Sequence, residues 1–230
     1  AVPVVAGHTP SARFRVTNLE GHAVTVRPRA TATPGLSVST AAAPVRIPAH
    51  GSVTVPVAVS VAEGTSTGTV TLTAGARSAR IPAEVTGNLV RVATMSASST
   101  HSGSDPAWAN DGGTDSEVWL NGVGGWNDDT AGDFPDTLTA TWAAPVSLGR
   151  VRVLTLDSGR SPASKVGLRD FDVEALVDGD WRTVATVRGN TAGTVERTFG
   201  PVPASALRLV VRDSNDHKYS RVMELEGYGT

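Results

Sequence analysis

Residues 52–61 read SVTVPVAVSV, with Val at every second position from Val53 to Val61 and other residues, among them Pro56 and Ala58, between them. Side chains alternate between the two faces of a β-strand, so this pattern predicts a strand with one buried face. Similar alternation recurs between Ser11 and Val85, in stretches such as ARFRVTN and GTVTLTAG that Gly- and Pro-containing turns separate. About seven short strands in fewer than about 90 residues predict an immunoglobulin-like β-sandwich.

The composition of the 230-residue chain is that of a folded, non-membrane protein. Hydrophobic residues make up 40%, charged residues 18%, and the formal net charge is −2, so no basic surface for nucleic acid is expected. The absence of Cys excludes disulfides and thiolate metal sites. No run of about 18 apolar residues occurs, so we expect no membrane span.

The second part of the chain differs in composition but again predicts strands. All five Trp and both Tyr lie beyond residue 100, which places a domain boundary near Gly87 and gives two domains, 1–87 and 88–230. Alternating stretches such as TLTATW and DFDVEALV continue the all-β pattern. The segment LVDGDW, residues 176–181, predicts a hairpin, because Asp-Gly suits the positive φ angles of a two-residue turn.

Several motifs of residues 88–229 occur in the order found in one known family. They are NLVRVATMSASST, AWANDGGTDSEVW, GWNDDTAGDFPDTLTATWAAPVSLGRVRVLTL, GLRDFDVEALVDGDWRTVATVRGNT and LRLVVRDSNDHKYSRVMELEGYG. This region resembles the discoidin (F5/8 type C) family, which overlaps with the family 32 carbohydrate-binding modules, and the resemblance implies a jelly-roll β-sandwich. Residues 1–87 resemble, more weakly, the immunoglobulin-like spacer domains beside catalytic domains of bacterial glycoside hydrolases.

The segment WANDGGTDSE, residues 108–117, has the composition of a calcium loop. Ca²⁺ takes six to eight oxygen ligands, and this segment offers the Asp111 carboxylate, the Ser116 hydroxyl and turned carbonyls. The resemblance implies a structural Ca²⁺ whose ligands come from six residues: Trp108, Asp111, Gly113, Ser116, Met223 and Glu224. In the alternative interpretation the segment is only a turn, with Asp111 capping it and Glu224 exposed.

A sugar site needs an aromatic face and a few polar groups on loops at one end of a sandwich. The predicted ligand-binding residues are Trp126, Asp157, Arg160, His217 and Tyr219. Arg160 is expected to bridge two hydroxyls, with Trp126 or Tyr219 stacking on the ring. In the alternative, Trp126 only covers the end of the sandwich. The acids of residues 124–136 are expected to form turns or to be solvated, with a contact to ligand at the tip.

The sequence therefore predicts a non-catalytic, monomeric carbohydrate-binding and spacer region of a secreted bacterial glycoside hydrolase, with glycan and the parent catalytic domain as partners. No Gly-x-Ser-x-Gly or His-Glu-x-x-His motif occurs, and acids in an exposed Gly-rich loop lack the burial that raises a catalytic pKa. The alternatives are a structural or protein-binding module without a sugar ligand, and a hydrolase that uses the loop acids.

Overall fold

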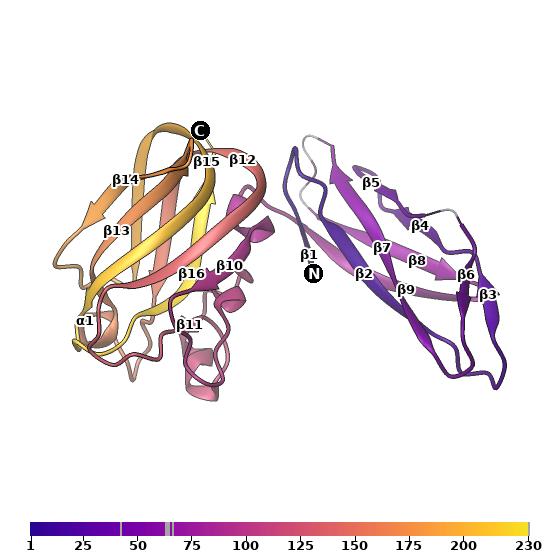
Figure 1. Cartoon of the computed structure of the whole chain (residues 1–230), viewed down its shortest axis with the longest axis horizontal. Coiled ribbons are helices and arrows are strands. Elements are labelled where there is room, and N and C mark those ends of the chain that lie inside the picture. The colour runs from indigo at the N-terminus through magenta and orange to yellow at the C-terminus, as the bar shows by residue number, and fades with distance from the viewer. Residues whose placement is uncertain (42, 63–64, 66, 230) are drawn as a thin grey trace. The chain divides into compact units, whose positions relative to one another are not determined.

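A computed structural model describes residues 1–41, 43–62, 65 and 67–229 (Figure 1). The chain divides into two compact units, unit 1 (Ala1–Gly87) and unit 2 (Asn88–Thr230), and each is described by itself. Both are built almost entirely of β-strands, which confirms the predicted all-β class. Among the described residues no helix is long and apolar enough to cross a membrane.

Unit 1 is a β-sandwich. Its strands are β1 (Val2–Val4), β2 (Ser11–Thr17), β3 (Val24–Val26), β4 (Arg29–Ala32), β5 (Leu36–Ser39), β6 (Val45–Ile47), β7 (Ser52–Val61), β8 (Thr67–Ala74) and β9 (Arg77–Val85). One sheet has the order β1-β9-β8-β4, a second the order β2-β7-β5, and β3 pairs with β6. In β7, Val55, Val57 and Val59 are buried while the residues between them are more exposed, as the alternation predicted.

The alternating stretch AVTVRPRA, residues 23–30, is divided between two strands, since β3 ends at Val26 and β4 begins at Arg29, directly after Pro28. Proline has no N–H to donate to a neighbouring strand, so it interrupts the ladder.

Unit 2 combines long strands with short helical turns. Its elements are η1 (Leu89–Val92), β10 (Thr94–Ala97), η2 (Pro106–Asn110), η3 (Ser116–Asn121), β11 (Trp126–Asn127), β12 (Asp136–Thr155), α1 (Ala163–Val166), β13 (Leu168–Val177), β14 (Asp180–Val187), β15 (Thr194–Ser214) and β16 (Arg221–Tyr228). The strand order is β11-β16-β12-β15-β13-β14, with β10 also paired to β12.

The 20-residue strand β12 links the two halves of the unit 2 sandwich. Its first half pairs with β10 and its second half with β16, while β15 pairs along both halves. Register shifts between Thr141 and Val146 and between Leu148 and Arg150 mark where the pairing with β15 is irregular. Such irregularities bend a strand, so one strand contributes to both layers around a single core. The predicted hairpin is present, with Asp178 at φ 55° and Gly179 at φ 91° between β13 and β14.

The start of unit 2 is held to its last strand by a buried side chain. Asn88 is 4% exposed, and its Oδ1 accepts hydrogen bonds from Val90 N and from Gly227 N of β16, each at 3.0 Å. One oxygen therefore caps η1 and satisfies a backbone donor of the last strand.

Replacing Asn88 by Ala is expected to lower the free energy of unfolding of unit 2 by about 2–4 kcal/mol, because two buried N–H groups lose their acceptor. Tryptophan fluorescence during chemical unfolding measures this, since all five Trp lie in unit 2. The control is Asn121→Ala, which removes an exposed amide from η3 and should change stability by less than about 0.5 kcal/mol. Equal effects of the two substitutions would contradict the assignment.

Candidate functional site

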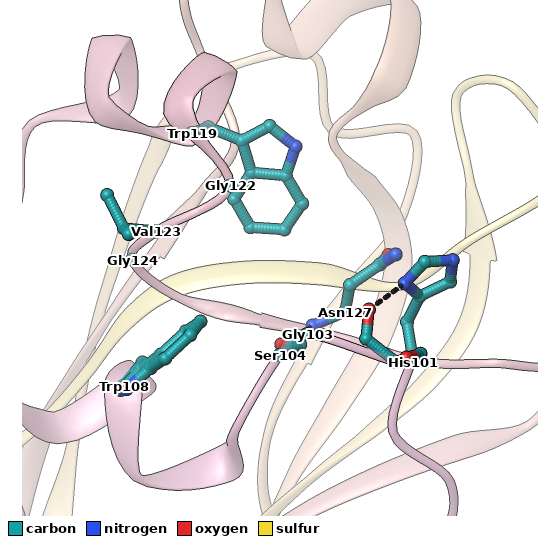
Figure 2. Close-up of a pocket in the computed structure, with 10 residues that line it drawn as sticks. His101, Gly103, Ser104, Trp108, Trp119, Gly122, Val123, Gly124 and Asn127 are labelled. Atoms are coloured by element: carbon teal, nitrogen blue, oxygen red, sulfur yellow. Dashed lines mark hydrogen bonds between the residues drawn. The ribbon is translucent and has the colours of Figure 1, made fainter.

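A cavity of about 280 Å³ opens between the segment that follows β10 and the segment that joins η3 to β11. It is lined by His101, Ser102, Gly103, Ser104, Trp108, Trp119, Gly122, Val123, Gly124 and Asn127 (Figure 2). We call it the Trp108–Trp119 cavity. Its lining comes from a continuous stretch of fewer than about 30 residues that leaves the sandwich after β10 and returns as β11.

Two capped helical turns place the aromatic side chains. The Asp105 carboxylate accepts a hydrogen bond from Ala107 N at 2.9 Å and Pro106 occupies the first turn of η2, which carries Trp108. Asp115 accepts from Glu117 N at 2.9 Å and caps η3, which carries Trp119 and ends at Gly122 with φ 70°. Local sequence therefore dictates where each indole leaves the backbone.

The two indoles form apolar walls of the cavity. Trp108 and Trp119 are both half-buried, and Figure 2 shows them on either side of the space that Val123 borders. Trp119 also packs against a small cluster made of Leu154, Leu156 and Met223. This backing fixes one face of the ring and leaves its remaining surface to the cavity.

Asn127 supplies a polar group that the protein itself does not use. Its amide extends toward the space between Trp119 and His101 (Figure 2), and its Oδ1 is buried with no hydrogen-bond partner among the described residues. The neighbouring polar groups are engaged: Ser104 Oγ donates to Gly125 O at 3.2 Å and accepts from Asn127 N at 3.1 Å, and His101 Nδ1 lies 2.9 Å from Ser102 O. A buried polar oxygen without a protein partner requires a hydrogen-bond donor from water or from a bound molecule.

Two buried carboxylates, those of Asp128 and Asp136, hold the segment that follows β11 to Ser220. Asp128 is 0% and Asp136 2% exposed, and the Thr130 hydroxyl lies within hydrogen-bond distance of both carboxylates. Ser220 N donates to Asp128 Oδ1 at 2.6 Å, and Ser220 Oγ donates to Asp136 Oδ2 at 2.8 Å. The expectation that these acids are solvated is therefore wrong for Asp128 and Asp136, whereas Asp129 and Asp133 are exposed. Asp128 does form a turn, as expected, because its Oδ2 accepts from Thr130 N at 2.8 Å. Both buried carboxylates are engaged internally, so neither is presented to a substrate.

The predicted stacking role of Trp126 is also wrong. Its side chain is 0% exposed, belongs to the main core of unit 2, and donates from Nε1 to Ser99 O at 3.0 Å. The indole therefore has no face for a ligand, and the alternative, that Trp126 closes the end of the sandwich, describes it.

The other predicted ligand residues lie on two loops that are hydrogen-bonded to each other, since Asn215 Nδ2 donates to Ala163 O at 2.8 Å. Asp157 Oδ1 caps α1 by accepting from Ala163 N at 2.9 Å, whereas Arg160 is exposed and makes no hydrogen bond or ion pair with the described residues. His217 Nδ1 lies 2.8 Å from Asp213 Oδ1, and the Tyr219 ring lies 5.2 Å from the Arg221 guanidinium. Of these four side chains, Arg160 is the one that remains uncommitted.

The loop of Arg160 adjoins the cavity-bearing segment. Gly159 N donates to Glu117 Oε1 at 2.7 Å, and Asp157 N donates to Ser116 Oγ at 3.1 Å. These bonds join residues 157–159 to η3, the helix that carries Trp119.

The predicted calcium ligands bring together two carboxylates from distant parts of unit 2. Glu224 is 0% exposed, so the interpretation with an exposed Glu224 is wrong, and both of its carboxylate oxygens lie 3.2 Å from Gly112 N. Burial raises the pKa of Glu224 to about 8; the Gly112 N–H and the Arg91 guanidinium oppose this shift, and the Asp111 carboxylate adds to it. A buried carboxylate beside a second carboxylate is an environment that a divalent cation would stabilise.

The other predicted calcium ligands are backbone carbonyl oxygens and the hydroxyl oxygen of Ser116. Within the described ranges no three His, Cys, Asp or Glu side chains form a metal-binding group, so a cation here would depend on carbonyls for most of its ligands. Asp111 Oδ1 accepts from Gly113 N at 2.7 Å, and Ser116 Oγ accepts from Asp157 N. The oxygen-only chemistry of the set fits a hard cation such as Ca²⁺.

Sequence reasoning missed the cavity. It named Trp108 only among the calcium ligands and did not include Trp119 among the ligand-binding residues, whereas both indoles line the site. The stretch TLTATW indicates that Trp142 belongs to the core, but no local pattern separates Trp108 and Trp119 from Trp126, which also lies in a polar segment and is fully buried.

The Asp128–Asp136 pair predicts a pH-dependent stability. Burial raises the pKa of Asp136 above its ordinary value of 3.8, the hydrogen bond from Ser220 opposes this, and the Asp128 carboxylate adds to it. The stabilising contribution is therefore present below the unfolded pKa and is lost as pH rises through the folded pKa. We expect the melting temperature of Asp136→Asn, relative to the unsubstituted protein, to increase as the pH is raised from about 4 to about 7.

The control for this measurement is Asp133→Asn, which removes an exposed carboxylate of the same loop and should give a difference that changes little with pH. A relative melting temperature of Asp136→Asn that falls with rising pH would contradict the direction of the shift.

Comparison with known proteins identifies the fold of unit 2. No protein-family model and no curated protein matches the chain. Chitosan-binding module 1 of a chitosanase/glucanase from Paenibacillus sp. IK-5 matches with a TM-score of 0.51 and 20% identity, over 62% of this chain and 98% of that one. The lectin domain of lectinolysin, solved with Lewis B antigen, matches with a TM-score of 0.52 and 20% identity, over 63% and 98%. As the resemblance predicted, the chain contains the β-sandwich fold of these carbohydrate-binding modules.

Proposed function

We propose that unit 2 is a non-catalytic glycan-binding module that holds a sugar in the Trp108–Trp119 cavity. The observation that carries this proposal is the combination of two half-buried indoles with the unpartnered amide of Asn127 in one cavity. A pyranose has apolar C–H faces and a rim of hydroxyls, so it matches an aromatic wall beside a hydrogen-bonding group.

The size and rigidity of the cavity suit one sugar ring. Its volume of about 280 Å³ lies just below the range for pockets that bind drug-sized ligands, which starts at about 300 Å³. The backbone that carries Trp119 and Asn127 is held by the η3 cap, the β11–β16 pairing and the Asp128–Ser220 hydrogen bond. A pre-organised site loses little conformational entropy when the ligand binds.

We propose that the protein is a secreted appendage of a glycan-active enzyme. Unit 2 would tether the catalytic domain to its glycan, and unit 1 would act as a spacer. The shared fold with a module of a chitosanase/glucanase supports this role. Tethering raises the local concentration of substrate at the catalytic domain, so weak binding per module is enough.

A protein ligand is the second candidate function, and one observation favours it. Val123 is 50% exposed at the rim of the cavity, and an exposed aliphatic side chain beside aromatic residues is also a feature of protein contacts. The sugar proposal is preferred because the site is concave and small.

Substitution of Asn127 by Ala is expected to weaken glycan binding about tenfold or more, since the amide would lose its hydrogen bonds to sugar hydroxyls. A glycan array followed by isothermal titration calorimetry of the full chain measures this. The Oδ1 of Asn127 is buried without a hydrogen-bond partner among the described residues, so the substitution should not lower the melting temperature. Trp119→Ala should abolish binding, whereas Trp181→Ala, which removes an indole of β14 stacked under Arg208, should not.

The variant Arg160→Ala tests whether the glycan binds in the cavity or at the neighbouring loop of residues 157–160. Retained affinity supports the cavity, and lost affinity with an unaffected Asn127→Ala variant would move the site to residues 157–160. A folded protein that binds no glycan on the array would contradict the proposed function and favour a protein ligand.

We further propose that unit 2 binds one structural Ca²⁺ through the side chains of Asp111, Ser116 and Glu224, with carbonyls of Trp108, Gly113 and Met223. The support is the buried Glu224 carboxylate next to Asp111 on a turn that Gly112 makes with φ 88°. The ion would neutralise two carboxylates and link the η2–η3 segment to β16, which stabilises the fold without taking part in chemistry.

Calcium at about one hundred times its dissociation constant is expected to stabilise unit 2 by about 2.7 kcal/mol relative to protein in EGTA. Thermal melts followed by tryptophan fluorescence measure the shift. Glu224→Gln should abolish the response to calcium. Glu226→Gln, which breaks the ion pair between Glu226 and Arg152, should lower stability but keep the response. Identical melts with calcium and with EGTA would rule out the ion.

A further inference from the structure

We infer that unit 1 binds an extended peptide segment of alternating apolar and acidic residues, which adds a strand to the open edge of β9. This inference goes beyond the spacer role of unit 1 and does not depend on glycan binding by unit 2. It follows from an uncovered strand edge, an apolar groove beside it and the charge around both.

The first half of β9 has a free hydrogen-bonding edge. In its sheet β9 lies between β1 and β8, but β1 pairs with it only over residues 83–85, whereas β8 pairs with nearly its whole length. No described strand covers residues 77–82 on the side of β1. Residues 77–80 are all exposed, as expected of such an edge. An uncovered row of N–H and C=O groups is a template for pairing with another chain.

The register shows which backbone groups point to this edge. Thr86, directly after β9, donates from its N to Val4 O of β1 at 3.0 Å, and alternate residues of a strand direct their N–H and C=O groups to the same side. The pairing between β8 and β9 has no register shift that would change this alternation. Ser78 and Arg80 therefore present their N–H and C=O groups to the uncovered edge.

An apolar groove of about 450 Å³ lies beside this edge, and residues 77–79 form part of its wall. Its apolar lining consists of Phe14, Val16, Val24, Val26, Ile47 and Leu72. Val24 and Val26 are only half-buried and lie outside the core cluster of unit 1, and Leu19, which also lines the groove, is 82% exposed. An incoming strand would cover this apolar surface with every second side chain.

Leu19 is held in its exposed position by a well-bonded loop. The buried side chain of Asn18 donates from Nδ2 to His22 O and to Pro48 O, each at 2.8 Å, and its Oδ1 accepts from Glu20 N at 3.0 Å. The leucine is therefore exposed on a preformed surface, which loses little conformational entropy when a partner binds.

The charge around the groove selects an acidic partner. Seven Arg and three Glu give residues 1–87 a formal net charge of +4, whereas thirteen Lys and Arg against nineteen Asp and Glu give residues 88–230 a charge of −6. All seven Arg of unit 1 are exposed, and none forms an ion pair with a described residue. Arg15 and Arg77 line the groove, together with one acid, Glu20. Acidic residues of an incoming strand would find these guanidinium groups without a carboxylate partner.

The same charge argues against a second copy of this chain as the occupant. Basic side chains on an edge strand oppose edge-to-edge pairing of two copies, because two like-charged edges repel each other. A strand with acidic residues is attracted instead. Addition of an extended peptide to an open edge takes its affinity from backbone hydrogen bonds and its specificity from alternate side chains.

The test measures binding of fluorophore-labelled synthetic peptides to the full chain by fluorescence anisotropy. The probe is a peptide of about eight residues, within the usual length of a strand, in which Val alternates with Glu. Comparison peptides replace every Glu by Lys or every Val by Ser. We expect the Val–Glu peptide to bind and the two comparison peptides to bind at least about tenfold more weakly at low salt, because each lacks the charge or the apolar side chains that the groove requires.

Ser78→Pro removes a donor of the uncovered edge without touching the pairing with β8. Pro82 has the same place in the alternation of β9, so proline there is compatible with the strand. The substitution should weaken binding of the Val–Glu peptide about tenfold, since a hydrogen bond is lost and the ring obstructs the edge. The matched control Ser78→Ala keeps the N–H and should leave the affinity unchanged.

Arg77→Gln tests the role of charge with a conservative change in an exposed side chain. It should weaken binding of the Val–Glu peptide about fivefold at about 20 mM salt and have little effect at about 300 mM salt, because salt screens an exposed charge. The matched control is Arg29→Gln in β4, at the opposite edge of the same sheet, which should not change the affinity.

The outcomes decide between the possible occupants. No binding of the Val–Glu peptide by the folded protein, equal binding of all three peptides, or equal affinities of Ser78→Pro and Ser78→Ala would overturn the inference. A dimer in analytical ultracentrifugation that Ser78→Pro converts to a monomer would also overturn it, by showing that a second copy occupies the edge. None of these results bears on glycan binding by unit 2, which Asn127→Ala tests separately.

Discussion

The hydrogen bonds between Asp128 and Ser220 are the constraint on which the candidate site depends. Residues 92 positions apart in the chain are joined where Ser220 N donates to the fully buried Asp128 carboxylate. Burying a carboxylate is costly unless donors surround it, and here Thr130 and Ser220 supply them. Asn127 precedes Asp128 directly, so the same interaction positions the amide in the cavity wall and keeps β11 paired with β16.

The cavity illustrates how a rigid sandwich carries a site on irregular segments. The strands β12 and β15 form the frame, and the site lies on short helical turns that leave this frame between β10 and β12. Gly125 shows how closely this segment approaches the sheet, because a Cβ there would lie 2.6 Å from Val222 O and the residue has φ 71°. Only glycine fits that position, so the turn before Trp126 is determined by steric exclusion.

The two units differ in their content of aromatic residues and of ion pairs. Unit 1 has a core of aliphatic side chains with Phe14 as its single aromatic residue, which provides no aromatic platform for a sugar. Unit 2 contains every Trp and Tyr, and most of its sheet charges form Arg–carboxylate pairs. This division agrees with a spacer followed by a module whose loops contact the ligand.

The sequence by itself determined the all-β class, the hairpin at Asp178 and Gly179, and the resemblance that predicted the fold of unit 2. These features follow from local rules, because strand alternation, turn residues and their order are all written along the chain. It did not determine the fate of individual side chains at the candidate site. Trp126 and Trp119 are both Trp in Gly-rich surroundings, yet the first is buried and the second lines a cavity. Likewise Asp128 and Asp129 are adjacent, and one is buried while the other is exposed. Only tertiary structure decided these outcomes, because burial depends on which distant strand or loop packs against a residue, and Ser99, Ser220 and Val222 lie far from these residues in sequence.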